Sequence, residues 1–138
     1  MREHEALVIR TGAERLADRA RITLTVDLPD GVHIEPHQPA EPHLIPTVVD
    51  VDGLTDMTVE YPEPVVKDLG WHDARLVVLE GVVQFVITGL IPEDADRVSG
   101  SLRYQPCIGG ACLPPRTIQW SAPLTCSTAY SVLRALAA

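Results

Sequence analysis

The chain has 138 residues, a length that suits a single domain with its own hydrophobic core. Its formal net charge is −8 and its 11 basic residues are scattered, which argues against a nucleic-acid-binding surface. No apolar run approaches the roughly 20 residues of a membrane-spanning helix. The opening MREHEALVIR also lacks the apolar segment of a signal peptide. The sequence therefore predicts a soluble domain.

The first predicted elements precede residue 32. HEALVIR (residues 4–10) favours an opening strand, and GAERLADRA (residues 12–20) favours one helical turn. The clearest strand is RITLTVDL (residues 21–28), in which every second residue is apolar, a pattern typical of a half-buried strand. Pro-Asp-Gly at residues 29–31 predicts the turn that ends it.

Three further segments predict strands in the middle of the chain. LIPTVVDVDG (residues 44–53) contains a proline, which suggests an edge strand or a bulge. DMTVEYPEP (residues 56–64) predicts a strand that ends at the prolines. ARLVVLEGVVQFVITGL (residues 74–90) is rich in β-branched residues and is broken at Glu80-Gly81, so it predicts two strands or one bulged strand.

Two last strands, VSGSLRYQP (residues 98–106) and RTIQWSAPL (residues 116–124), flank a loop with two cysteines. Seven or eight short strands at intervals of roughly ten residues indicate an all-β sandwich. Twelve prolines and nine glycines leave little room for helices. We expect one domain over residues 1–126 and a tail at 127–138 that forms a short helix or a linker.

The cysteine loop reads YQPCIGGACLPPRTI and places Cys107 and Cys112 five positions apart. A structural zinc site needs a second pair of ligands, and the remaining cysteine, Cys126, stands alone. The histidines of HQPAEPH (residues 37–43) do not have a recognised ligand spacing and are expected to be solvated. These observations argue against a metal site.

The cysteine pair fits either a structural disulfide, which acts only as a staple for the fold, or a redox couple. Facing positions of a hairpin lie within disulfide reach, and Gly109 and Gly110 let the loop turn. Closing so short a loop stabilises the fold by only about 2 kcal/mol, which weakens the case for a staple. An exposed hairpin end is open to a partner's sulfur, and Pro106, Pro114 and Pro115 stiffen both sides of it.

Five segments carry a resemblance to a known family: LPDGVHI, LIPTVVDV, VEYPEP, VVLEGVVQFVI and LRYQPCIGGACLPP. The last is the most specific, because it contains Tyr-Gln-x-Cys, a short spacer, a second cysteine and prolines. From roughly Thr23 to Leu124 the sequence resembles the N-terminal, extracytoplasmic domain of the thiol:disulfide interchange protein DsbD and related stand-alone or fused domains.

This resemblance implies an immunoglobulin-like antiparallel β-sandwich of about seven to nine short strands with little helix. It implies thiol-disulfide exchange, an oxidoreductase activity that uses only the disulfide and no other cofactor. Electrons would come from a membrane-linked thioredoxin-like module and pass, through transient mixed disulfides, to thioredoxin-fold proteins of the periplasm or the outer face of the membrane. Those recipients would include disulfide isomerases and cytochrome c maturation factors. Cys112 would form the mixed disulfide and Cys107 would resolve it, within a larger membrane-bound or thioredoxin-fused protein.

The family shields its cysteines with a cap loop, which should fall around residues 67–74 here. Known members place a phenylalanine over the disulfide, but the only phenylalanine of this chain, Phe85, lies in a predicted strand. Trp71 is the expected substitute, with Leu69 and His72 beside it.

For other residues near the site, the sequence allows two interpretations each. Tyr104 either contacts a sulfur or is a plain strand aromatic. The resemblance brings His33 near the site, and the alternative is a satisfied strand histidine. Cys126 is either a buried, inert thiol or a third redox group. The alternative function for the whole chain is a non-catalytic immunoglobulin-like interaction or adaptor domain with a structural disulfide.

Overall fold

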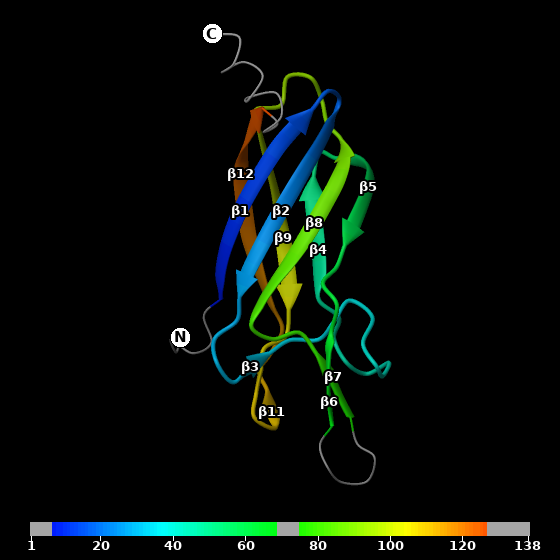
Figure 1. Cartoon of the computed structure of the whole chain (residues 1–138), viewed down its shortest axis with the longest axis vertical. Coiled ribbons are helices and arrows are strands. Elements are labelled where there is room, and N and C mark those ends of the chain that lie inside the picture. The colour runs from blue at the N-terminus through cyan, green and yellow to red at the C-terminus, as the bar shows by residue number, and fades with distance from the viewer. Residues whose placement is uncertain (1–6, 69–74, 127–138) are drawn as a thin grey trace.

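A computed structural model of the chain describes residues 7–68 and 75–126, and this part folds entirely into strands and loops (Figure 1). The strands are β1 (Val8–Leu16), β2 (Arg19–Asp27), β3 (Val32–His33), β4 (Val48–Asp52), β5 (Thr55–Glu60), β6 (Val65–Asp68), β7 (Arg75–Val78), β8 (Val82–Leu90), β9 (Arg97–Tyr104), β10 (Cys107–Ile108), β11 (Ala111–Cys112) and β12 (Arg116–Cys126). Among the residues that the structure describes, none form a helix with the length and hydropathy that crossing a membrane requires. The predicted tail, residues 127–138, lies outside the described residues.

Seven strands form one sheet in the order β4-β9-β12-β1-β2-β8-β5, which folds over into two layers. Figure 1 shows β1, β2 and β8 in front, with β4 and β9 behind them. β4 and β5 are the two edges of this sheet, which agrees with the prolines that flank them.

The core fills the space between the two layers, and alternate residues of each strand supply it. Its largest fully buried side chains include, from both layers, Ile22, Leu24, Val26, Phe85, Ile87, Val49, Leu102 and Tyr104. The predicted half-buried strand at residues 21–28 and the break at Glu80-Gly81 are both confirmed. The prediction of an all-β sandwich is therefore correct.

The helical turn predicted over residues 12–20 is wrong. Its first residues belong to β1, its last residues begin β2, and Ala17 turns the chain at φ 58°. β1 pairs with β2 along its whole length, from Val8↔Asp27 to Leu16↔Arg19, and with β12 on its other side. Hydrogen bonds to two neighbouring strands outweigh the weak helical preference of this segment.

The sandwich also differs from the prediction in strand number and direction. β1 and β12 run parallel, with Ala13 opposite Leu124, so the sheet is not purely antiparallel. The described residues form twelve strands rather than about seven to nine, because very short strands form outside the main sheet. β3, β10 and β11 make a small three-stranded sheet, and β6 and β7 make a ribbon. Both lie at the same end of the sandwich (Figure 1).

Candidate redox site

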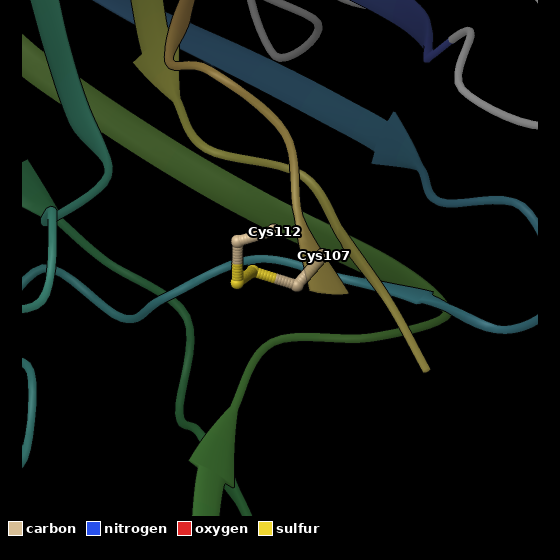
Figure 2. Close-up of a disulfide and its surroundings, with 2 residues drawn as sticks. All are labelled: Cys107 and Cys112. Atoms are coloured by element: carbon tan, nitrogen blue, oxygen red, sulfur yellow. A yellow bond between two sulfur atoms is a disulfide. The ribbon is translucent and has the colours of Figure 1, made fainter. Parts of the chain in front are cut away.

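The two cysteines face one another across a small hairpin at the end of the sandwich. β9 and β12 remain paired as far as Tyr104↔Arg116, and the chain between them leaves the main sheet as β10 and β11. Cys107 and Cys112 are a directly opposed pair with Cα atoms 4.0 Å apart, and a disulfide joins them (Figure 2). Gly109 makes the turn with φ 60°, a conformation that glycine adopts without strain.

The two cysteines differ in exposure. β10 is the central strand of the small sheet, between β11 and β3, and Cys107 is only 1% exposed. β11 is an edge strand of that sheet and Cys112 is exposed. A partner's sulfur can therefore reach the Cys112 side of the bridge more easily than the Cys107 side.

His33 lies directly opposite Cys107 in the pairing of β3 with β10. Opposed residues of antiparallel strands project to the same face, so the imidazole lies on the disulfide's side of the small sheet. Burial is the main influence on the pKa of His33 and lowers it; Glu80 raises this pKa and Lys67 lowers it further. Lys67 and Glu80 are themselves an ion pair, with Nζ and Oε2 2.7 Å apart.

A groove of about 440 Å³ opens beside the disulfide. Three segments come together around it: β3 with the loop that follows, β7, and the cysteine hairpin. Its polar and sulfur-bearing lining consists of His33, Glu35, Glu41, His43, Arg75, Cys107 and Cys112. Within residues 7–68 and 75–126, no group of three or more His, Cys, Asp or Glu side chains is arranged to hold a metal ion.

Glu35 is a groove residue that the sequence reasoning missed. The residue is only 5% exposed, and no described residue hydrogen-bonds its buried Oε1 atom. Burial raises the pKa of Glu35, and the nearby His43 partly lowers it. The signal was present in the sequence, because Glu35 lies two residues after His33 and so shares its face of an extended segment.

Both histidines of residues 37–43 are exposed to solvent, as the sequence predicts, and His37 also packs against its neighbours. The His37 ring stacks on Tyr61 with centroids 3.8 Å apart, and its Nδ1 lies 3.0 Å from the Thr47 carbonyl oxygen. His43 is exposed and lies 3.4 Å from a carboxylate oxygen of Glu41. His37 therefore helps to fix the loop that borders the groove.

Tyr104 belongs to the buried core and is only 2% exposed. Burial raises its pKa, whereas the charge of Arg116 and a hydrogen bond to it act in the opposite direction. Arg116 is the residue opposite Tyr104 in the pairing of β9 with β12. These contacts agree with a strand aromatic that anchors the base of the hairpin.

The predicted cap residues Leu69, Trp71 and His72 lie outside the described residues. The ribbon β6–β7 flanks that segment, and Arg75 and Leu76 of β7 line the groove. Cys126 is the last residue of β12, where it pairs with Arg15 of β1.

Comparisons with known proteins agree with this geometry. Residues 4–122 match the family model "Thiol:disulfide interchange protein DsbD, N-terminal". A sequence search of curated proteins finds no match. Among solved structures, the N-terminal periplasmic domain of ScsB from Proteus mirabilis has a TM-score of 0.67 and 19% identity. That likeness covers 96% of this chain, which spans only about half (53%) of the ScsB chain.

Two structures from Neisseria meningitidis are also similar. The reduced N-terminal domain of DsbD has a TM-score of 0.54 and 16% identity, over 88% of this chain and 87% of the other. The complex between the DsbD N-terminal and PilB N-terminal domains has a TM-score of 0.52 and 16% identity. This likeness covers 88% of this chain and 85% of the other. These likenesses confirm the predicted immunoglobulin-like sandwich. Because the family model spans most of the sequence, the chain belongs to the family of the N-terminal domain of the thiol:disulfide interchange protein DsbD.

Proposed function

We propose that this domain carries electrons as a Cys107/Cys112 dithiol-disulfide couple, to or from thioredoxin-fold proteins in an extracytoplasmic compartment. One observation carries the proposal: in a member of this family, the two cysteines form a disulfide at the end of a hairpin, with one residue exposed and the other buried. The exposed edge gives a partner's sulfur access to Cys112, which exchange requires and a purely structural disulfide does not.

The proposed exchange proceeds through a mixed disulfide. The Cys112 thiolate attacks a partner's disulfide, forms a new S–S bond and releases one partner sulfur as a thiolate. Cys107 then attacks Cys112, restores the intramolecular disulfide and releases the second partner thiolate. Two electrons pass to the partner, and the reverse sequence reduces this domain. The exposure of Cys112 and the burial of Cys107 support this division of roles.

In the free domain, activation of the cysteine thiols depends on the residues that line the groove, because nearby cations favour thiolate formation. Arg75 lines the same groove as both cysteines. Arg116 is engaged with the buried Tyr104. A docked partner would supply the remaining stabilisation of the attacking thiolate.

Related structures support the choice of compartment and partner. The ScsB domain is called periplasmic, and the DsbD domain of N. meningitidis forms a complex with another protein domain. We extend both properties to this chain, together with a place in a larger membrane-bound or thioredoxin-fused protein.

The reduction potential of the pair tests the proposal against a purely structural disulfide. We expect a value between about −180 and −270 mV, the range of thioredoxin-type and isomerase carriers. Titration against glutathione or dithiothreitol, with thiol trapping and mass detection, provides it. A value below about −300 mV would indicate a structural bond and favour the adaptor alternative.

A further inference from the structure

Within residues 7–68 and 75–126, the packing gives no structural explanation for the buried side chain of Glu35. In the described part of the chain, it is the one acidic or basic side chain among the buried residues. Its Oε1 atom is shielded from solvent and has no hydrogen-bond partner among the described residues. A buried carboxyl group with an unsatisfied oxygen destabilises a fold. Such a group is therefore a candidate for a chemical role.

The position of Glu35 connects it to the buried sulfur. Its backbone is fixed beyond β3, because Ile34 bridges to Leu79 and the Thr47 hydroxyl donates a 2.6 Å hydrogen bond to the Glu35 carbonyl oxygen. Glu35 follows His33 by two residues in this extended segment, and His33 is opposite Cys107. Glu35 and Cys107 consequently line one groove, and both residues are almost completely removed from solvent.

Cys107 needs a proton donor and acceptor during exchange. A sulfur that leaves a disulfide departs as a thiolate, and a buried thiolate is poorly stabilised by its surroundings. Bulk water has little access to a residue that is 1% exposed. A buried acid in the same groove can supply and recover this proton.

We propose that Glu35 is the proton carrier for Cys107 in the thiol-disulfide exchange of this domain. The inference rests on the proposed function, and it adds a residue that neither the cysteine motif nor the predicted cap contains.

The proton transfer balances in both directions. During reduction, a donor dithiol attacks Cys112 as thiolate, the Cys107–Cys112 bond breaks, and Cys107 leaves with the electron pair. The Glu35 carboxyl group gives its proton to the Cys107 sulfur and becomes a carboxylate. During oxidation, the carboxylate takes the proton from Cys107, and the resulting thiolate attacks the mixed disulfide at Cys112 and expels the partner's thiolate.

The electrostatic environment of the groove agrees with this role. Burial raises the pKa of Glu35, so this carboxyl group keeps its proton more readily than an exposed one does. His33, Glu41, His43 and Arg75 are the other titratable or charged residues that line the groove. Lys67 and Glu80 act on His33 from the ribbon and the following loop. His33 is the rival proton carrier, because it is the direct neighbour of Cys107.

The test is the pH dependence of disulfide reduction in the full chain. Reduction by dithiothreitol is followed by acid quench, thiol trapping and mass detection, and each rate constant is divided by the thiolate fraction of the reductant. For the wild-type protein, we expect the corrected rate constant to fall at least about tenfold as pH rises through the titration of Glu35. In Glu35→Gln this fall disappears. Glu41→Gln, which removes an exposed acid of the same groove, keeps it.

Three outcomes would overturn the inference: a corrected wild-type rate that does not change with pH, a Glu35→Gln profile equal to that of the wild type, or loss of the pH dependence in His33→Gln instead. If Glu35→Gln fails to fold, Glu35→Asp replaces it, and we expect a shifted inflection. An inflection that stays in place contradicts the inference. Dithiothreitol replaces the protein partner in this experiment. Its result therefore tests the role of Glu35 even if no thioredoxin-fold protein exchanges disulfides with the domain.

Discussion

His33 and Cys107 are paired residues of β3 and β10, although they lie 74 positions apart in the chain. This pairing holds the cysteine hairpin against the end of the sandwich and aligns an imidazole with the disulfide. Since β3 continues into the segment that carries Glu35, the same pairing brings a buried carboxyl group to the groove.

The first prediction concerns pH and His33. Burial lowers the pKa of this histidine in the folded protein from the ordinary value of 6.5. The unfolded chain therefore binds more protons than the folded one between that lowered pKa and 6.5, so the free energy of unfolding falls as pH drops through this window. His33→Gln should lose that part of the pH dependence. Urea unfolding of both oxidised proteins from pH 4.5 to 8 measures it, and a constant difference between them would refute the prediction.

The second prediction concerns the close approach of two strands at Gly100. A Cβ atom added there would collide with the backbone carbonyl of Asp50 in β4 and with the ring of Trp120 in β12. We expect Gly100→Ala to lower the free energy of unfolding by about 1–3 kcal/mol, because neither the backbone nor the packed ring can move freely.

Gly12→Ala is the matched control for Gly100→Ala. A Cβ atom at Gly12 in β1 has open space within 4 Å, and the stability should change by no more than about 0.5 kcal/mol. Urea unfolding provides both values. Equal effects of the two substitutions would show that the close approach at Gly100 is not present.

The third prediction concerns the turn of the cysteine hairpin. Gly109 has φ 60°, whereas the neighbouring Gly110 does not have a positive φ, and both have open space for a Cβ atom. Gly109→Ala should destabilise the oxidised domain by about 1 kcal/mol, and Gly110→Ala should have a much smaller effect. If reduction relaxes the turn, the reduction potential of Gly109→Ala rises by about 20 mV. A larger effect at position 110 than at position 109 would contradict the geometry of the turn.

Much of the sandwich can be predicted from the sequence, because in its half-buried strands every second residue is apolar and faces the core. The apolar positions of residues 21–28 are buried as expected, and the chain does break at Glu80-Gly81. The segment at residues 12–20 could not be assigned in this way. Its strand is stabilised by pairing with two neighbours, β2 and β12. The conformational preferences of the segment itself give no information about these partners.

The candidate site could be predicted only in part for the same reason. The motif around Cys107 and Cys112 is local, and the sequence identifies it without knowledge of the fold. The groove is not local, because it needs the pairing of β3 with β10 and the approach of β7. Glu35 becomes a candidate only once its burial beside Cys107 is known.

The most direct test of the proposed function is to trap the domain with a thioredoxin-fold protein. The partner keeps its attacking cysteine and has its resolving cysteine replaced by serine, and it is mixed in reduced form with the oxidised domain before rapid alkylation. We predict a one-to-one covalent adduct through Cys112, with Cys107 alkylated, in the wild type and in Cys126→Ser. Peptide mapping under non-reducing conditions identifies the linked cysteine. No adduct with the wild-type domain, or an adduct through Cys107 or Cys126, would contradict the proposed function.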